Sequence, residues 1–281
     1  MIPARNAAPT LGGVLQALAV QDPPPDEVIV VDDASTDETA GVAERHGAKV
    51  VRLESARSAG GGRNRGWEEA SGDVVVFLDA DAVPAEGWGA GVRRAAAEFP
   101  RALVACARTF EARTRWGWVA HLEFETPYLP RGAPRSEPTL SSFCMLVPAD
   151  AELRWDESYG GEDGLFCVEA LAAGLELVFD PRFHAVHDHR RESFGDLRGQ
   201  QRRFVYGFAR GRRLLDEPAY RRLSPRLPLH YFALLRLPVI YRRIRHDRAL
   251  RSRFLRLLPW LVAGEWLLGL SALRYALRSP K

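Results

Sequence analysis

Short apolar runs recur through the first eighty positions, separated by segments with helical spacing. VIVV at 28–31, KVVRL at 49–53 and VVVFL at 74–78 read as strands, because β-branched residues dominate these short runs. Leucines and valines within 10–19 keep the spacing of one helix face, and the glycine-rich stretch 58–66 reads as a turn into a further helix. Strands this continuously apolar are buried on both faces. The pattern therefore predicts an α/β fold with a mostly parallel sheet flanked by helices.

The middle of the chain is less regular. LVACA at 103–107 and FCMLV at 143–147 again read as strands, and the segment between them is aromatic and rich in loop residues. Residues 161–174 predict a helix, because two acids occupy its first turn and a glycine can end it. These elements complete a first predicted domain, residues 1–195.

Arginine dominates the rest of the chain. Residues 190–281 hold 22 Lys and Arg against 6 Asp and Glu, whereas residues 1–189 hold 17 against 30. The stretch 257–273 carries one charge, Glu265, but its 17 residues fall short of the about 20 that a spanning helix needs. Arginines flank it, which favours an interfacial or re-entrant helix. We therefore predict a basic, amphipathic helical region at 196–281 that associates with a membrane; a helical subdomain packed on its own core is the alternative.

The expected location follows from cysteine usage and from this charge. Cys106, Cys144 and Cys167 lie in apolar surroundings without CxxC spacing, which predicts buried free thiols and a reducing compartment. The first ten residues show no leader pattern. A basic tail suits the anionic inner leaflet, so we expect a cytoplasmic protein, peripheral on the inner face of the cell membrane. Charge alone would also allow nucleic acid binding, but the Leu and Trp content of the tail fits lipid better, and we expect no nucleic-acid partner.

Four carboxylates follow predicted strands, at the edge of a parallel sheet where ligands bind. Asp32 and Asp33 follow VIVV, and Asp79 and Asp81 follow VVVFL. Two aspartates at i and i+2 can face one cation, and Mg²⁺ and Mn²⁺ prefer such oxygen ligands. The alternative for each pair is the capping of a turn or of the next helix, a common role of aspartate.

Three further features could complete a site around these acids. The glycines at 60–62 would let the backbone approach a phosphate, and Arg63 would add a charge-assisted hydrogen bond. Glu162 and Asp163 open a predicted helix, and an ionised carboxylate there can take a proton from an attacking hydroxyl. His187 could complete a metal shell. Compensation of the helix dipole and a structural histidine are the simpler alternatives.

In their order and spacing, these pieces resemble the family-2 inverting glycosyltransferases, which bind nucleotide sugars on a GT-A fold. The matching stretches are IPARN (2–6), VIVVDDASTDET (28–39), GGRNRG (61–66), FLDADAVP (77–84), DESYGGEDGLF (156–166) and VHDHR (186–190). The resemblance implies a GT-A-type, Rossmann-like domain that carries the catalytic machinery.

The resemblance also implies a role for each matched residue. The nucleotide-sugar pocket would be formed by Pro3, Ala4, Arg5, Asn6, Asp32, Asp33, Arg63, Asp79 and Ala80. A Mn²⁺ or Mg²⁺ ion on the diphosphate would be bound by Asp79, Asp81 and His187. Asp163, with Glu162 beside it, would be the general base that activates the acceptor hydroxyl.

The function implied is transfer of one sugar from a nucleotide-diphospho-sugar to a lipid-linked or cell-envelope glycan, with inversion. QQRRF at 200–204 resembles a signature of polymer-making synthases, but the chain lacks their set of channel helices, which favours single transfers. One alternative is a haloacid-dehalogenase-like phosphatase with Asp79 as nucleophile, although the lysine that class needs is poorly matched by Lys49 or Lys281. The other alternative is an inactive, membrane-bound scaffold.

Overall fold

The computed structural model describes residues 1–158, 161–188, 190–213 and 233–278, which belong to two compact units. The first unit comprises Met1–Thr109 and Pro130–His189, and the second comprises Phe110–Leu129 and Arg190–Lys281. The second unit therefore includes residues 110–129, which the division made from the sequence assigns to the first domain.

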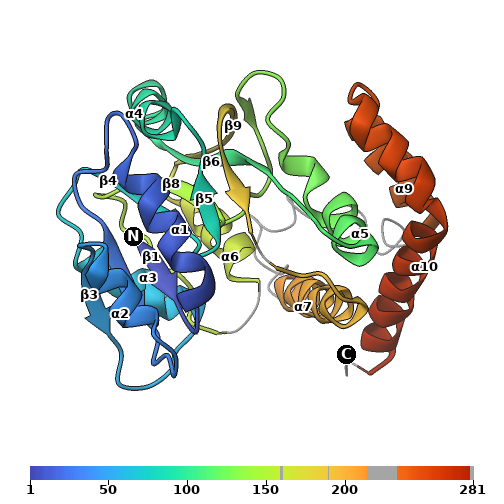
Figure 1. The fold of residues 1–281 in the computed structure, drawn as a ribbon, viewed down its shortest axis with the longest axis horizontal. Coiled ribbons are helices and arrows are strands. Elements are labelled where there is room, and N and C mark those ends of the chain that lie inside the picture. Colours follow the sequence, from blue (N-terminus) through green and yellow to red (C-terminus); the bar gives the residue numbers. More distant parts are fainter. Residues whose placement is uncertain (159–160, 189, 214–232, 279–281) are drawn as a thin grey trace. The chain divides into compact units, whose positions relative to one another are not determined.

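The first unit interleaves strands and helices along the chain (Figure 1). Its strands are β1 (Ile2–Ala4), β2 (Ile29–Asp32), β3 (Lys49–Arg52), β4 (Val74–Leu78), β5 (Ala82–Pro84), β6 (Ala102–Thr109), β7 (Arg135–Ser136), β8 (Cys144–Pro148) and β9 (Glu176–His187). Its helices are α1 (Ala8–Ala19), α2 (Thr39–Arg45), α3 (Ala59–Glu68), α4 (Trp88–Glu98) and α6 (Glu162–Ala172).

The sheet is mixed rather than mostly parallel. Strands β1, β2 and β3 pair in parallel, and a second group runs in the order β4, β8, β6, β9 and β5. In that group only β6 and β9 are parallel neighbours. The two groups meet at β1 and β4, where the Met1 nitrogen donates to Val76 O at 2.7 Å and Leu78 N donates to Met1 O at 3.0 Å. The predicted α/β architecture is present, with antiparallel pairing in its second half.

Helices cover both faces of the sheet. Successive strand residues point to opposite sides, so apolar side chains on both faces need to be covered. On one side, Ile2 and Val30 belong to a buried cluster with Leu11 and Val14 of α1. On the other side, Val31 approaches α3, where a Cβ on Gly66 would lie 3.0 Å from its side chain. Burial on both faces explains why these strands read as uninterrupted apolar runs.

The glycines at 60–62 lie inside α3 and not in a turn that precedes it. Each is buried, and the space that a side chain would need is taken by neighbouring protein. A Cβ on Gly60 would lie 2.1 Å from Asp156 O, and one on Gly62 would lie 3.2 Å from the Pro3 Cβ. The run therefore allows α3 to pack closely on β1 and on the loop before α6. This packing accounts for the glycines without an approach to phosphate.

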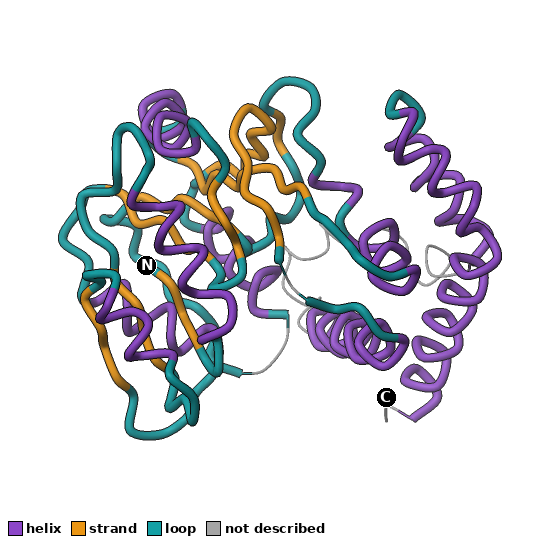
Figure 2. Tube along the Cα trace, in the orientation of Figure 1, coloured by secondary structure: helices purple, strands orange, loops and turns teal. Residues whose placement is uncertain are grey.

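The regular elements of the second unit are helical over its described residues (Figure 2). They are α5 (Arg115–Phe124), the 3₁₀ helix η1 (Thr126–Tyr128), α7 (Phe194–Arg213), α9 (Ala233–Ile244) and α10 (Arg248–Arg278). Helix α10 contacts α5, α7 and α9, and their apolar faces share one core. That core includes Leu122, Leu197, Ile240, Phe254 and Leu261, all buried. The helical, arginine-rich region predicted from the sequence is thus present.

A polar network lies inside this helical core. Glu123 of α5 and Glu265 of α10 are 1% and 0% exposed. Gln201 Nε2 donates to Glu123 Oε2 at 3.2 Å and to the carbonyl of Gly264 at 2.9 Å. The Arg236 Nη1 atom lies 3.4 Å from Glu265 Oε2. Burial raises the pKa of both carboxyls, the negative charge of Glu265 raises that of Glu123 further, and Arg236 opposes both shifts.

This network should make the chain less stable at about pH 9 than at about pH 6. A carboxyl whose pKa is raised by folding binds its proton more tightly in the folded state, so stability falls as pH rises through that interval. Thermal unfolding at the two pH values measures the difference. Glu123→Gln should reduce it, and Glu111→Gln, a change at an exposed glutamate, should leave it intact. Equal pH dependence in the wild type and in Glu123→Gln would contradict the assignment.

One helix of the described residues is long and apolar enough to cross a membrane. It is the segment Arg248–Ser271 of α10, with a mean hydropathy of 1.2 over its best window. Of that window, 28% is buried against the protein. Length and composition alone are weak signs of a span, since helices of protein cores can have both.

Candidate active site

The ends of β1 and β2 are fastened to each other by the residues that follow them. Asp33 N donates to Ala4 O at 2.8 Å. Asn6 adopts a left-handed backbone conformation, with φ 51°, and its backbone N–H donates to Ser35 Oγ at 2.9 Å. The Asn6 side-chain oxygen accepts from Thr36 N at 2.8 Å. These bonds hold the predicted nucleotide-pocket loop in one shape.

The two aspartates after VIVV are buried and accept backbone hydrogen bonds. Asp32 Oδ1 accepts from Ser35 N at 3.1 Å, which is the turn-capping alternative considered for it. Asp33 Oδ1 accepts from Arg57 N at 2.6 Å. Arg5 is exposed, so its side chain is accessible to a ligand.

A buried arginine links two of the predicted site acids. Arg63 of α3 is 3% exposed, and its Nη2 donates to Asp79 Oδ1 at 3.1 Å. Its Nη1 lies 3.7 Å from Glu162 Oε1. The guanidinium also stacks over the Trp155 ring, 4.7 Å from its centre. Arg63 thereby connects the turn after β4 to the first turn of α6.

Asp79 lies where several charges meet. Burial is the main reason that the pKa of Asp79 is raised, to about 6. The negative charges of Asp81 and Asp163 raise this pKa further, whereas Arg63 and His187 lower it. The Asp79 side chain is 33% exposed, so solvent weakens these charge interactions. Repulsion among neighbouring carboxylates is the condition that a bound cation relieves.

The second aspartate of the pair faces a histidine. Pairing of β5 with β9 sets Ala82 opposite His187, and this register brings the His187 Nε2 atom to 3.6 Å from Asp81 Oδ2. His187 is 6% exposed and packs against the Phe143 ring, with ring centres 4.7 Å apart. Ala80, between the two aspartates, is half-buried. The strand pairing thus places His187 beside Asp81, and the charges of both residues act on Asp79.

Asp163 opens α6, directly after a glycine in a left-handed conformation. That glycine, Gly161, has φ 83° and directs the chain into the helix. The Asp163 Oδ1 atom is buried and accepts no hydrogen bond from the described residues. A buried carboxylate oxygen without a donor is costly, and an incoming hydroxyl would supply the missing donor. Its neighbour Glu162 is instead engaged with Arg63.

Aromatic residues that support this site were not selected from the sequence. Trp155 stacks on Phe166 of α6 with ring centres 3.8 Å apart, and Asn64 binds both backbone groups of Trp155, at 2.8 and 2.9 Å. Arg108, at the end of β6, is buried over the Phe143 ring. Arg108 stands alone in an apolar stretch and Trp155 lies between charged residues, so spacing gives no signal that either residue supports a site.

The donor set suits a hard divalent cation that also binds phosphate. Carboxylate oxygens are the preferred ligands of Mg²⁺ and Mn²⁺, and such ions commonly take one or two carboxylates and complete their shell with water and phosphate oxygens. Asp79 and Asp81 offer these oxygens on one turn. Within the described ranges, no three His, Cys, Asp or Glu side chains lie so that they could hold a metal ion together.

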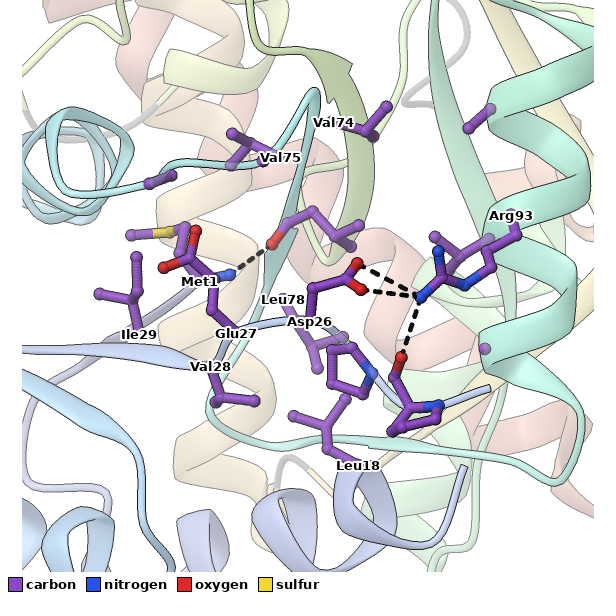
Figure 3. A pocket seen from close by; sticks show the side chains of 18 of the residues that line it. Met1, Leu18, Asp26, Glu27, Val28, Ile29, Val74, Val75, Leu78 and Arg93 are labelled. Carbon is purple, nitrogen blue, oxygen red and sulfur yellow. Dashed lines mark hydrogen bonds and ion pairs between the residues drawn. The ribbon is translucent and has the colours of Figure 1, made fainter. Parts of the chain in front are cut away.

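The cavity in Figure 3 lies at the other end of the strands. Its volume is about 350 Å³, and it is bounded by the starts of β1, β2 and β4 and by α4. Beside it, Arg93 pairs with exposed Asp26 at 3.2 Å. Its lining is largely apolar and includes none of the predicted site residues. The chemistry of the acids therefore belongs to the opposite, carboxyl-terminal edge of the sheet.

Comparison of the sequence with known proteins identifies its family. The model of glycosyl transferase family 2 matches residues 1–152. A pre-mycofactocin glycosyltransferase of Mycobacterium tuberculosis is 27% identical over 206 residues, which are 68% of this chain and 43% of the relative. TarS of Staphylococcus aureus, a poly(ribitol-phosphate) β-N-acetylglucosaminyltransferase, is 38% identical over 89 residues, 29% of this chain and 15% of the relative. The chain thus spans less than half the length of these curated relatives.

Solved structures extend the likeness over nearly the whole chain. A mannosyltransferase of Pyrobaculum calidifontis, in complex with GDP-Man and Mn²⁺, superposes with a TM-score of 0.60 at 19% identity, covering 97% of this chain and 85% of that one. TarS residues 1–349 with UDP-GlcNAc give 0.53 at 18% identity, covering 98% and 90%. These likenesses confirm the predicted GT-A-type fold. Since the family model also matches more than half of the sequence, the chain belongs to glycosyl transferase family 2.

Proposed function

We propose that this chain is an inverting glycosyltransferase, which moves one sugar from a nucleotide-diphospho-sugar to an acceptor hydroxyl. The observation that carries the proposal is the buried Asp163 oxygen, which has no hydrogen-bond donor among the described residues and lies beside the linked groups Arg63, Asp79 and Glu162. Family membership agrees with this reading and argues against a phosphatase.

The donor would be held at the ends of β1, β2 and β4. The base and ribose meet the loop of Pro3, Ala4, Arg5 and Asn6 and the Asp33 carboxylate. Asp79, Asp81 and His187 would hold a Mn²⁺ or Mg²⁺ ion on the diphosphate. When bound, that ion stabilises negative charge on the departing diphosphate. Arg63 would keep Asp79 in position through the 3.1 Å bond and would help to hold the nucleotide.

The reaction would be a single displacement. The acceptor oxygen forms a bond to the anomeric carbon as the bond from that carbon to the diphosphate oxygen breaks, and the electron pair leaves with the diphosphate. Asp163 takes the proton of the hydroxyl, so the attacking oxygen does not accumulate positive charge. One base and one step invert the anomeric carbon, without a covalent sugar–enzyme intermediate.

The acceptor we propose is a lipid-linked or cell-envelope glycan, reached at a membrane. The segment 233–278, which includes α9 and α10, contains ten arginines and two acidic residues. Each basic residue near an anionic leaflet contributes about 1 kcal/mol to binding. The chain would thus work as a peripheral protein on the cytoplasmic face of the cell membrane.

A thermal-shift panel of nucleoside diphosphates and their sugars tests the donor proposal. At least one nucleoside diphosphate should raise the melting temperature, by several degrees at saturation, and more in the presence of Mn²⁺ or Mg²⁺ than with EDTA. The base that gives the largest shift identifies the donor class. If no diphosphate stabilised the chain with either metal, the proposal would fail. Stabilisation without turnover of any donor would favour the inactive scaffold.

A further inference from the structure

Helix α10 has two faces of opposite character. Its inner face packs on the second unit through Phe254, Leu261 and Leu268, which are at most 4% exposed. Polar groups fasten the same face: the carbonyl of Gly264 accepts from Gln201, and that of Leu267 accepts from Arg198 Nη1 at 3.2 Å. This face is already occupied by the protein's own helices.

The outer face carries an apolar stripe. Its members, spaced by three, four, seven or eight residues along the helix, are Leu255 at 56% exposure, Leu258 at 37%, Trp266 at 55%, Leu270 at 44% and Leu273 at 53%. Residues at such spacings share one side of a helix. Large exposed apolar side chains are scattered elsewhere on the described surface, but here five lie in one row over about 27 Å of helix.

The same side of the helix also carries positive charge. Arg248 and Arg251 lie in its first turn, Arg256 follows, and Arg274 lies beyond the end of the stripe; all four are exposed. None of the four has an acidic partner among the residues that the structure describes. An apolar row with exposed arginines before, beside and after it complements an anionic bilayer surface, since lipid tails would contact the row and headgroups would contact the guanidinium groups.

We propose that α10 lies flat in the interface of an anionic bilayer, with the stripe Leu255, Leu258, Trp266, Leu270 and Leu273 inserted into the headgroup–acyl boundary. This inference rests on the membrane partner of the proposed function and specifies its contact surface.

The packing of α10 argues against a span. Helix α7 lies against α10 and carries Arg202 and Arg203, both exposed. A bilayer around α10 would surround these charges with hydrocarbon at a high cost. Glu265 lies in the middle of the apolar stretch and is held inside the unit next to Arg236. Flat insertion leaves all of these groups in protein or in water.

Flotation of the full chain with sealed vesicles tests the surface. We expect binding to vesicles of phosphatidylglycerol and phosphatidylcholine in equal parts, and weak binding to phosphatidylcholine alone. Leu255→Gln/Trp266→Gln should lower partitioning at least about tenfold, because two large apolar groups no longer insert. The matched control Val20→Gln/Leu171→Gln changes two exposed apolar residues of the first unit and should bind as the wild type does. Melting temperatures of both variants establish that they are folded.

Labelling from one side distinguishes a flat helix from a span. The three native cysteines are buried, so Arg248→Cys and Arg274→Cys each add one accessible thiol. A membrane-impermeant maleimide added outside sealed vesicles should label both variants equally. Protection of one position would establish a span and overturn the proposal.

Two further results would also overturn the proposal. One is that Leu255→Gln/Trp266→Gln floats with vesicles as well as the wild type does. The other is that the wild type does not bind vesicles but self-associates in solution, and that the same variant abolishes this self-association. None of these readouts involves the donor, so the thermal-shift panel reports separately on the proposed activity.

Discussion

Asp163→Asn should lower glycosyl transfer by about 10³-fold and leave stabilisation by the nucleoside diphosphate unchanged. The amide has nearly the shape of the carboxylate but cannot accept the proton of the acceptor hydroxyl. Because Asp163 Oδ1 accepts no hydrogen bond from the described residues, the substitution breaks few contacts of the resting protein. Transfer from the donor identified by the thermal-shift panel, measured at saturating acceptor, gives the loss in kcat.

Glu162→Gln is the matched control for this prediction. It changes the adjacent carboxylate on the same turn of α6, and Glu162 already lies 3.7 Å from the guanidinium of Arg63. Loss of that ion pair should shift the position of Arg63 and reduce transfer by about tenfold at most. A large loss in Glu162→Gln together with near-normal transfer in Asp163→Asn would mean that the two residues have the opposite roles.

Strand β2 was readable from the sequence because burial on both faces leaves an unbroken apolar run. Strands β3 and β4 were readable from their β-branched residues, although β3 is only partly buried. Strands β6 and β8 were also predicted as strands, but their antiparallel pairing was not, since a run buried on both faces looks the same in either direction. Strand β5 has three residues, too few for a periodic pattern. Strand β9 contains Asp180 and Pro181 and lies opposite a register shift in β6, which interrupts its alternation.

The acidic residues of the candidate site could be predicted from the sequence, but the contacts that link them could not. Asp79, Asp81 and Asp163 stand out because carboxylates directly after strands or at a helix start are conspicuous in a sequence. The link from Arg63 to Asp79 joins positions sixteen residues apart through the packing of α3, and nothing in the spacing reports it. The adjacent glycines were attributed to phosphate binding, whereas the atoms around them in the structure belong to the protein.

The second large effect is expected for Asp81→Asn. This change should abolish the additional stabilisation that Mn²⁺ gives to the diphosphate complex, and lower transfer by about 10²-fold to 10³-fold. As a metal ligand, Asp81 would contribute both an oxygen and negative charge, whereas the asparagine would keep only a weak oxygen ligand. Melting temperatures with diphosphate, measured over a series of Mn²⁺ concentrations, should show that higher metal concentrations partly restore the shift.

The control is the same chemical change at the far end of the sheet. Asp26→Asn alters an exposed aspartate that pairs with Arg93 beside the cavity of Figure 3, and it should leave the metal-dependent shift unaltered. His187 lies 3.6 Å from Asp81, so replacement of the carboxylate also removes the negative charge facing that ring. If Asp81→Asn and the wild type showed equal stabilisation at every Mn²⁺ concentration, the metal would not be bound at this pair, and charge on the departing diphosphate would have to be stabilised by other residues.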